Sequence, residues 1–551
     1  MESRREAAPT GIKTKNLNAE SMKSFFRLPL AFVALTACVE TLSADDRPNI
    51  LLAIGDDISW KHIGIYGSPF MDTPTFDRLG RQGVVFNNAY CSAPGCSPSR
   101  AALLTGKYIW EIEEAGTHAS NFPKHLKVYP DLLEKEGYFP GYTGKPWGPG
   151  KLPERDRNPA GPEFNIHKLE PPATGISDKD YSKNFEEFLK ARPDGRPFVF
   201  WFGAHEAHRV FEQGSGKRNG VDPDETIVPA FLPETELTRE DVADYGFEIE
   251  WFDSHLGRML KQLERIGELD NTIVVVTADN GMAFPRAKAN NYEYGVHMPL
   301  IISWRKGIAH EGRFIDDFVS LIDLAPTFLE AARAPIPEEM SGRSLTPLLK
   351  SSAEGKIDST RNFVLSGRER HTHARKDNLG YPIRAIHTAK YNYIRNLHPE
   401  RSPTGIEYKD VDGSPSHSLM LSDMDSRLSQ LAYGQRPLEE LYDKENDPYC
   451  LNNLATNSKY KPILEKLGAR LESELRKGGD PRILGYGEVF DSYPRYSTTR
   501  KYPGFNISGK YNPEFVERAL EKMKALGIEN PAYEDRVDYN KSQPARAPSR
   551  N

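Results

Sequence analysis

The chain has 551 residues, with 38% hydrophobic and 27% charged side chains and a formal net charge of −6. The composition is that of a soluble globular protein, and the length favours two domains over one. A net charge this mild excludes a protein that binds nucleic acid or a membrane through a strongly basic surface, so an anionic substrate needs a locally positive pocket.

The N-terminal region has the pattern of an export signal. Residues 22–27 form a basic start, residues 28–39 an apolar run, and Leu42-Ser43-Ala44 a small-residue cleavage site. The apolar run is too short for a comfortable transmembrane helix. We therefore expect a secreted or periplasmic protein, with residues 1–44 as an upstream segment and signal peptide. Anchoring as a lipoprotein is the alternative, because Leu35-Thr36-Ala37-Cys38 resembles a lipoprotein box.

Alternating strands and helices are predicted for residues 45–350. Buried strands are indicated by four continuous apolar runs, Asn49–Ile54, Pro197–Phe202, Thr272–Thr277 and Leu300–Trp304. Helical patterns include Val242–Ile266 and Leu321–Ala332. This alternation predicts an α/β fold with a doubly wound parallel sheet, in which ligands bind beyond the carboxyl ends of the strands.

A second, smaller α+β subdomain is predicted for residues 351–480. The composition loosens at Ser351–Gly355, and a short strand at Tyr393-Ile394 and a helix at Pro462–Leu475 follow. Residues 481–551 are expected to form a C-terminal extension, which is rich in Tyr, Pro, Arg and Asn.

Two of the predicted strands end in acidic or amide side chains. Asp56-Asp57 follows the first strand, and Asp279-Asn280 follows the third. Adjacent buried carboxylates stay ionised only with a cation between them, and oxygen ligands favour Ca²⁺ or Mg²⁺ over zinc. The two pairs together predict a metal site, whereas each pair alone is equally compatible with a helix cap or a turn.

The segment Cys96-Ser97-Pro98-Ser99-Arg100 begins a predicted helix. Pro98 suits the first helical position, and Gly106 suits the position just past the end. Cys96 then lies at the helix N-terminus, where free N–H groups favour an anion, and Arg100 lies beside it one turn further on. A buried cysteine at a helix cap is the structural alternative.

Cysteine usage does not indicate a disulfide scaffold. The chain has four cysteines, Cys38, Cys91, Cys96 and Cys450, which are too few for such a framework. If Cys38 is removed with the signal, three remain and at least one must stay unpaired. A Cys91–Cys96 or a Cys91–Cys450 bridge is the alternative to a reactive Cys96.

Four further side chains are candidates for binding an anion or carrying a proton. They are Lys145, Lys288 and the two histidines that follow the second strand, His205 and His208. Histidines three positions apart at a strand end favour a functional role, whereas the lysines have a solvated loop as their structural alternative. The spacing of Cys, His and Glu does not match a structural zinc site.

The stretch Cys96–Gly106 resembles the signature of the type I sulfatases, a family with an alkaline-phosphatase-like fold. Similarity to that family extends over about residues 47–460. Within the family the chain is most similar to the branch that acts on the N-sulfate of glucosamine, as judged from His205–Arg209, Asp279–Pro285 and Val319–Leu324.

The resemblance implies a nucleophile made from Cys96. A separate maturation enzyme that recognises Cys-x-Pro-x-Arg would oxidise Cys96 to Cα-formylglycine. One hydroxyl of the hydrated aldehyde would attack sulfur, and the other would later allow sulfate to leave. One Ca²⁺ ion would be bound by the modified Cys96 together with Asp56, Asp57, Asp279 and Asn280.

The resemblance also implies roles for the cations, and two positions depart from the family pattern. Arg100 would steady the hydrate, Lys145 and Lys288 would bind sulfate oxygens, and His208 would bind sulfate and protonate the leaving group. Trp147 stands where most relatives have histidine, so we expect protonation to depend on His208, helped by His205. Lys288 stands where the N-sulfate branch has arginine, so a bidentate contact becomes a point charge.

The sequence therefore predicts an exported sulfatase that acts on a sulfated glycan, with the N-sulfate of glucosamine as the leading substrate. His205, Arg370 and His371 are expected to contact the sugar, although a solvated loop is the alternative for the polar run Ser366–His373. The open alternatives are an O-sulfatase on another sulfated polysaccharide, a phosphomonoester or phosphonate hydrolase of the same superfamily, and a glycan-binding pseudoenzyme.

Overall fold

The structure is a computed structural model that describes residues 45–497, 500–504 and 509–542. The predicted export signal, its cleavage site and Cys38 lie outside the described residues. None of the helices in the described ranges combines the length and the apolarity that crossing a membrane requires.

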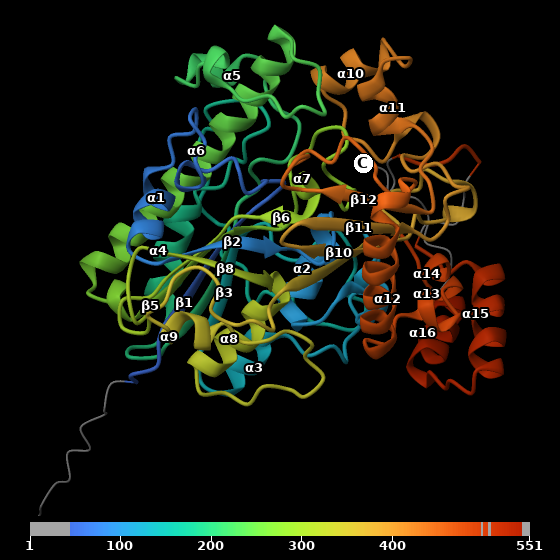
Figure 1. Ribbon diagram of the computed structural model, residues 1–551. Coiled ribbons are helices and arrows are strands. Elements are labelled where there is room, and N and C mark those ends of the chain that lie inside the picture. Colours follow the sequence, from blue (N-terminus) through green and yellow to red (C-terminus); the bar gives the residue numbers. More distant parts are fainter. Residues whose placement is uncertain (1–44, 498–499, 505–508, 543–551) are drawn as a thin grey trace, which may run out of the picture. The chain divides into compact units, whose positions relative to one another are not determined.

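A mixed sheet of eight strands forms the centre of the described chain (Figure 1). Its strands are β1 Asn49–Gly55, β2 Val84–Tyr90, β3 Phe139–Gly144, β4 Phe198–Gly203, β5 Thr272–Ala278, β6 His297–Met298, β7 Leu300–Ser303 and β8 Arg313–Ser320. The strands β3, β4, β1 and β5 lie side by side in that order and run parallel. Beyond β5, β7 pairs antiparallel with β5 and with β2, whereas β8 pairs parallel with β2.

The predicted α/β fold is confirmed, with a correction to one strand direction. Three of the predicted runs are the parallel strands β1, β4 and β5. The fourth run is β7, which pairs antiparallel with β5, so that Ile301 lies opposite Val276. All four residues of β7 are buried. A strand covered on both faces is apolar throughout whatever its direction, and the sequence pattern therefore could not distinguish the two pairings.

Helices cover the sheet on its two sides (Figure 1). α6 packs against α1, α4 and β1, whereas α2 packs against α3 and α8. The helices of this part are α1 Pro74–Arg81, α2 Cys96–Thr105, α3 Tyr129–Lys135, α4 Tyr181–Ala191, α5 Ser215–Arg218, α6 Glu236–Arg265, α7 Glu293–Val296, α8 Leu324–Ala331 and α9 Thr346–Lys350. The helix predicted at 242–266 begins earlier, because the Thr235 hydroxyl accepts a hydrogen bond from the backbone N–H of Thr238 and caps the helix there.

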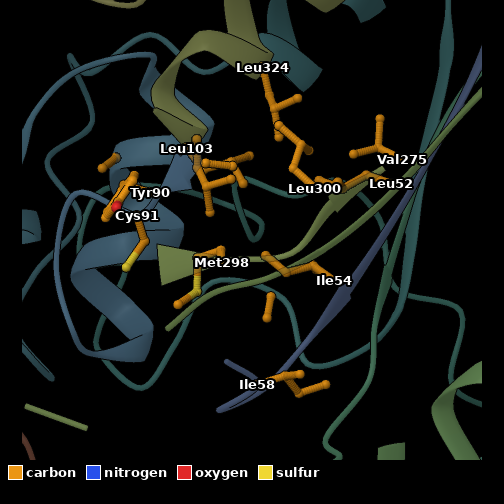
Figure 2. Packing of buried hydrophobic residues seen from close by; sticks show 14 of the residues in the cluster. Leu52, Ile54, Ile58, Tyr90, Cys91, Leu103, Val275, Met298, Leu300 and Leu324 are labelled. Atoms are coloured by element: carbon orange, nitrogen blue, oxygen red, sulfur yellow. The ribbon is translucent and has the colours of Figure 1, made fainter. Parts of the chain in front are cut away.

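An apolar core holds α2 against the sheet. Figure 2 shows one apolar cluster that runs from Leu103 of α2 past Leu324 of α8 and Leu300 of β7 to Leu52 of β1 and Val275 of β5. Each of these side chains is buried, and full burial of such a side chain contributes about 1.5–3 kcal/mol. The core therefore fixes the helix that begins with Cys96 relative to the ends of β1 and β5.

A smaller antiparallel sheet lies within the predicted subdomain. Its order is β12-β11-β10-β9, with bounds β9 Phe363–Arg368, β10 Ile383–Thr388, β11 Tyr391–Asn396 and β12 Glu439–Asp443. β9 contacts β8 of the central sheet, and the predicted helix at 462–475 packs on β10 and β11 as α12. The helices of this region are α10 Pro415–Leu421, α11 Arg427–Tyr433, α12 Lys461–Lys477, α13 Pro481–Leu484, α14 Glu488–Ser492, α15 Pro513–Ala525 and α16 Pro531–Ser542.

Candidate active site

The acidic pairs at the ends of β1 and β5 meet at one edge of the sheet. β1 and β5 are parallel neighbours, and Gly55 lies opposite Ala278 in their register. The backbone N–H of Asp57 consequently donates to Asp279 Oδ1 over 3.2 Å. One side-chain oxygen from each of Asp56, Asp57 and Asp279 lies within 4.8 Å of the other two, and all three residues are buried. The predicted gathering of these carboxylates is thus present.

The N-terminus of α2 brings Cys96 to the same place. One ligand atom from each of Asp56, Cys96 and His208 lies within 4.8 Å of the others. The helix ends as expected before Gly106, which has a left-handed φ of 66°. Pro98 occupies the third helical position and not the first, because Cys96 and Ser97 are already helical.

Cys96 is a poor nucleophile as a thiol. Burial raises the pKa of Cys96 to about 12, and the thiolate is the reactive form of cysteine. The described cysteines Cys91, Cys96 and Cys450 are all free, so neither of the two considered bridges is formed. Cys91 lies in the apolar core, as Figure 2 shows.

Arg100 connects the start of α2 to the strand ends. Its Nε donates to Asp279 Oδ2 over 2.6 Å, and its Nη1 donates to the backbone oxygen of Lys145 over 2.7 Å. The side chain is completely buried. Arg100 thereby fixes the relative positions of α2, the end of β5 and the segment that carries Lys145.

Two lysines form ion pairs with these carboxylates. Lys145 Nζ forms an ion pair with Asp56, and Lys288 Nζ lies 2.6 Å from Asp57 Oδ2. Burial disfavours the charge on Lys145, but the negative charge of Asp56, together with Cys96 and Asp279, more than offsets it and raises the pKa of Lys145 to about 12. Asp412 and Asp57 likewise overcome burial and raise the pKa of Lys288. Both ammonium groups are therefore charged at neutral pH.

The donor set fits a divalent cation. Burial, opposed by Lys288, raises the pKa of Asp57 to about 7, and the nearby charges of Asp56 and Asp279 add to this rise. Ionisation of all three carboxylates is therefore disfavoured unless a cation lies between them. Asn280 Nδ2 donates to Asp57 Oδ1 over 2.7 Å. Asn280 Oδ1 and Asp56 Oδ1 are buried without a hydrogen-bond partner among the described residues. Oxygen ligands of this kind suit Ca²⁺ or Mg²⁺, and a cation there would satisfy both oxygens.

The two predicted histidines follow β4 and differ in setting. His208 Nδ1 donates to the backbone oxygen of Arg209 over 2.7 Å, which leaves Nε2 as the nitrogen that exchanges protons. The charge of Lys288, together with burial, lowers the pKa of His208 to about 4. Burial and Lys145 lower the pKa of His205 to about 3. Both rings are therefore neutral at neutral pH.

Trp147 has a packing role. Its indole Nε1–H donates to the backbone oxygen of Ser97 over 3.1 Å, and its ring packs edge-on against Phe122. The side chain is buried. Trp147 therefore secures the first turn of α2 and offers no further N–H group to a ligand.

Arg370 and His371 differ in what they can contact. Arg370 donates through Nη1 to the backbone oxygen of Tyr493 and through Nη2 to that of Pro494, over 2.8 and 2.9 Å. Its two terminal nitrogens thus fasten the C-terminal extension. His371 lies beside the residue before Cys96, since a Cβ added to Gly95 would be 3.3 Å from His371 Nδ1.

Three further residues belong to this region and were missed in the sequence. Asp412 Oδ2 lies 3.1 Å from Lys288 Nζ, and Asp412 also forms an ion pair with Arg500. The ring of His118 lies 4.7 Å, centroid to centroid, from that of His371. These residues lie in loops without a recognisable pattern, and no local signal marked them.

The sequence matches two family models. Residues 48–334 match the model described as Sulfatase, and residues 287–400 match the model described as N-sulphoglucosamine sulphohydrolase, C-terminal. Human N-sulphoglucosamine sulphohydrolase is 28% identical over 488 residues, which cover 81% of this chain and 93% of the human protein. An ulvan-active sulfatase of Formosa agariphila is 27% identical over 493 residues, covering 83% of this chain and 80% of that protein.

Solved structures share the fold. The protein BT4656, in complex with its substrate D-glucosamine-2-N,6-O-disulfate, superposes with a TM-score of 0.59 at 21% identity, over 79% of this chain and 98% of that chain. The phosphonate monoester hydrolase of Agrobacterium radiobacter superposes with a TM-score of 0.57 at 17% identity, over 79% of this chain and 97% of that chain. These likenesses confirm the predicted architecture.

Proposed function

The chain belongs to the sulfatase family, and on that premise we propose that it hydrolyses a sulfated glycan, with the N-sulfate of glucosamine as the leading substrate. The observation that carries the proposal is the convergence of Cys96, four oxygen-bearing side chains and two lysines in one buried site. Two relatives support a sugar substrate, since the human relative is a sulphoglucosamine sulphohydrolase and BT4656 is bound to a glucosamine disulfate.

Conversion of Cys96 to formylglycine would give this site a nucleophile that the buried thiol does not provide. The protonated thiol of Cys96 has little nucleophilic character at neutral pH. In the formylglycine form, this position would supply a hydroxyl nucleophile and a route for sulfate release that needs no attack of water on sulfur. Arg100 cannot move away from the nucleophile, because Asp279 and the Lys145 carbonyl hold it in place.

Asp56, Asp57, Asp279 and Asn280 would hold the metal ion, which we propose is Ca²⁺. When bound, such an ion supplies positive charge for sulfate oxygens and lowers the pKa of the attacking hydroxyl. Lys145 and Lys288 each carry three N–H donors beside this cluster, and they would neutralise the remaining sulfate oxygens.

His208 would serve the leaving group. The one proton of the neutral ring is on Nδ1, bonded to the Arg209 carbonyl, so Nε2 would first accept a proton, for which the attacking hydroxyl is a source, and then pass it to the leaving group. His205 has a buried Nε2 without a hydrogen-bond partner among the described residues, so a substrate group could bind there. Trp147 contributes no proton, since its one N–H is bonded to Ser97.

The test is a sulfate-release assay on enzyme that is co-expressed with a formylglycine-generating enzyme. We expect release from glucosamine N-sulfate, and release from an O-sulfated sugar alone would favour the O-sulfatase alternative, which the ulvan-active relative supports. Faster turnover of an aryl phosphate than of an aryl sulfate would favour the phosphomonoester or phosphonate hydrolase. Absence of any release, with an intact thiol at Cys96, would favour the pseudoenzyme. Secretion or a periplasmic location stays a prediction from residues 22–44.

A further inference from the structure

Two histidines from distant parts of the chain lie together beside the first turn of α2. The ring centroids of His118 and His371 are 4.7 Å apart, and the backbone N–H of His118 donates to the Arg370 carbonyl over 3.2 Å. His371 lies against Gly95, the residue before Cys96. The pair is therefore a neighbour of the nucleophile position. His371 was predicted from the sequence to contact the sugar, whereas His118 was not singled out there.

Arg495 fixes the tautomer of His118. Its Nη2 donates to His118 Nδ1 over 3.5 Å, so Nδ1 is the acceptor and the neutral ring carries its proton on Nε2. Burial, followed by the effects of His371 and Arg495, holds the pKa of His118 well below its usual value. His118 therefore presents a fixed N–H donor and no positive charge at neutral pH.

His371 keeps both ring nitrogens available. The residue is only 5% exposed. No hydrogen bond joins either nitrogen to another described residue, and neither is among the buried polar atoms that lack a partner. These nitrogens are therefore not wholly buried and have no hydrogen-bond partner among the described residues, and the same holds for His118 Nε2.

The pair lies within electrostatic reach of the lysines that would bind sulfate. Lys288 contributes to the lowered pKa of His118 and of His371, and Lys145 also contributes to that of His118. The two rings therefore lie near the place where these lysines would hold a sulfate, with His371 against Gly95 beside Cys96.

The segment that carries His118 shares an anchor with Trp147. Trp147 is bonded to the Ser97 carbonyl, whereas the residue after His118, Ala119, donates its backbone N–H to Ser97 Oγ over 3.1 Å. The same residue of α2 thus anchors the indole and the segment that carries His118. His118 and Trp147 are thus held on the same residue of the first turn of α2.

We propose that His118 and His371 bind hydroxyl groups of the sugar that carries the sulfate, and that they orient it for attack. The proposal rests on the sulfatase function above and names the residues of that site which recognise the leaving group. Neutral imidazoles suit neutral hydroxyls, because each ring offers a donor and an acceptor without adding charge to a site that already has three cations. Such contacts favour a sugar over a leaving group that lacks hydroxyls.

The experiment compares a sugar with an aryl leaving group. His118→Ala and His371→Ala are assayed on 4-nitrophenyl sulfate and on the faster of glucosamine N-sulfate and glucosamine 6-O-sulfate. We expect kcat/KM on the sugar to fall about tenfold more than on the aryl sulfate, as loss of a hydrogen bond predicts. His118→Gln keeps an N–H donor and should recover most of the loss.

The controls separate this inference from the proposed function. His125→Ala changes an exposed histidine that pairs with Glu113, and it should leave the ratio of the activities on sugar and aryl sulfate unchanged. Melting curves check that each variant is folded. Equal losses on both substrates, or no loss on the sugar, would overturn the inference while the sulfatase proposal stands. A wild-type enzyme that releases sulfate from neither substrate overturns both.

Discussion

Lys288 Nζ lies 3.1 Å from Asp412 Oδ2, which joins a lysine of the candidate active site to the C-terminal half of the chain. Asp412 is buried and also pairs with Arg500. Lys288 thus lies between two carboxylates, Asp57 and Asp412. The position of its ammonium group consequently depends on the loop between β11 and β12 of the second sheet.

Asp412→Asn should weaken substrate binding. Without the second carboxylate, Lys288 loses a charged partner and shifts toward Asp57, so we expect kcat/KM to fall about tenfold, mainly through KM. Steady-state kinetics on the preferred sulfated sugar measure this. Asp423→Asn, at an exposed position of the same region, is the matched control, and an unchanged KM in Asp412→Asn would contradict the prediction.

Cys96→Ser should abolish sulfate release. The proposed route makes the aldehyde from the thiol of Cys96, and serine has a hydroxyl group in its place. Intact-mass analysis of the wild-type peptide should show conversion of the thiol to an aldehyde when the maturation enzyme is co-expressed. Cys91→Ala, which changes a core cysteine, should retain activity. A wild-type enzyme that is active while its Cys96 peptide carries only thiol would contradict the assignment.

Ca²⁺ should stabilise the fold. A ligand that binds only the native state raises the free energy of unfolding by about 2.7 kcal/mol when its concentration is 100 times its Kd. The melting temperature should therefore rise with Ca²⁺ and fall after chelation. Asn280→Ala removes one proposed oxygen ligand and should reduce this rise. Asp270→Asn, at an exposed ion pair, serves as the control. A melting temperature that is indifferent to Ca²⁺ and Mg²⁺ would argue against the metal site.

Trp147→His should not restore the family's usual catalysis. The change removes the packing on Phe122 and the hydrogen bond to Ser97, and we expect a loss of about 2–4 kcal/mol in the free energy of unfolding with no gain in kcat. Chemical denaturation and kinetics test both parts. Trp147→Phe keeps an aromatic ring and should lose less stability, whereas a more active Trp147→His enzyme would show that position 147 faces the substrate.

Asp491→Asn should destabilise the protein in a pH-dependent way. Although burial opposes its charge, Arg482 and Arg401 hold the pKa of Asp491 below its usual 3.8. A lowered folded pKa gives stability that is present above the unfolded pKa and is lost as pH falls through the folded one. Asp491→Asn should therefore lower the free energy of unfolding by about 3–5 kcal/mol at pH 7. The difference in that free energy between the variant and the wild type should become smaller below pH 3.8.

Urea unfolding at several pH values measures that difference. The carboxylate accepts from Arg482 Nη1 over 3.0 Å and from the backbone N–H of Gly380 over 3.1 Å, so the variant also reports how firmly the C-terminal extension is attached. Asp425→Asn, which is exposed, is the control. A constant difference from pH 7 to pH 3 would contradict the assigned charge state.

The strand-end residues were predictable because a general rule places them. Parallel neighbours end at the same edge of a sheet, so the positions of Asp56 and Asp279 after two apolar runs were enough to bring them together. An apolar run has no such marker for direction, and the antiparallel pairing of β7 was therefore missed. Asp412, His118 and Arg500 lie in loops whose positions depend on tertiary packing, which no local spacing encodes.

The burial of α2 also sets an order of events in the life of the chain. Every residue of this helix, from Cys96 to Thr105, is buried. If Cys96 is converted by a maturation enzyme as proposed above, that enzyme would have to reach it while the segment is still unpacked. Residues such as Asp412 and Arg500 are synthesised long after this segment. The yield of active protein would then depend on the rate of modification of Cys96 relative to the rate of folding. A host in which the chain is synthesised or folds faster should produce more inactive protein that still carries the thiol.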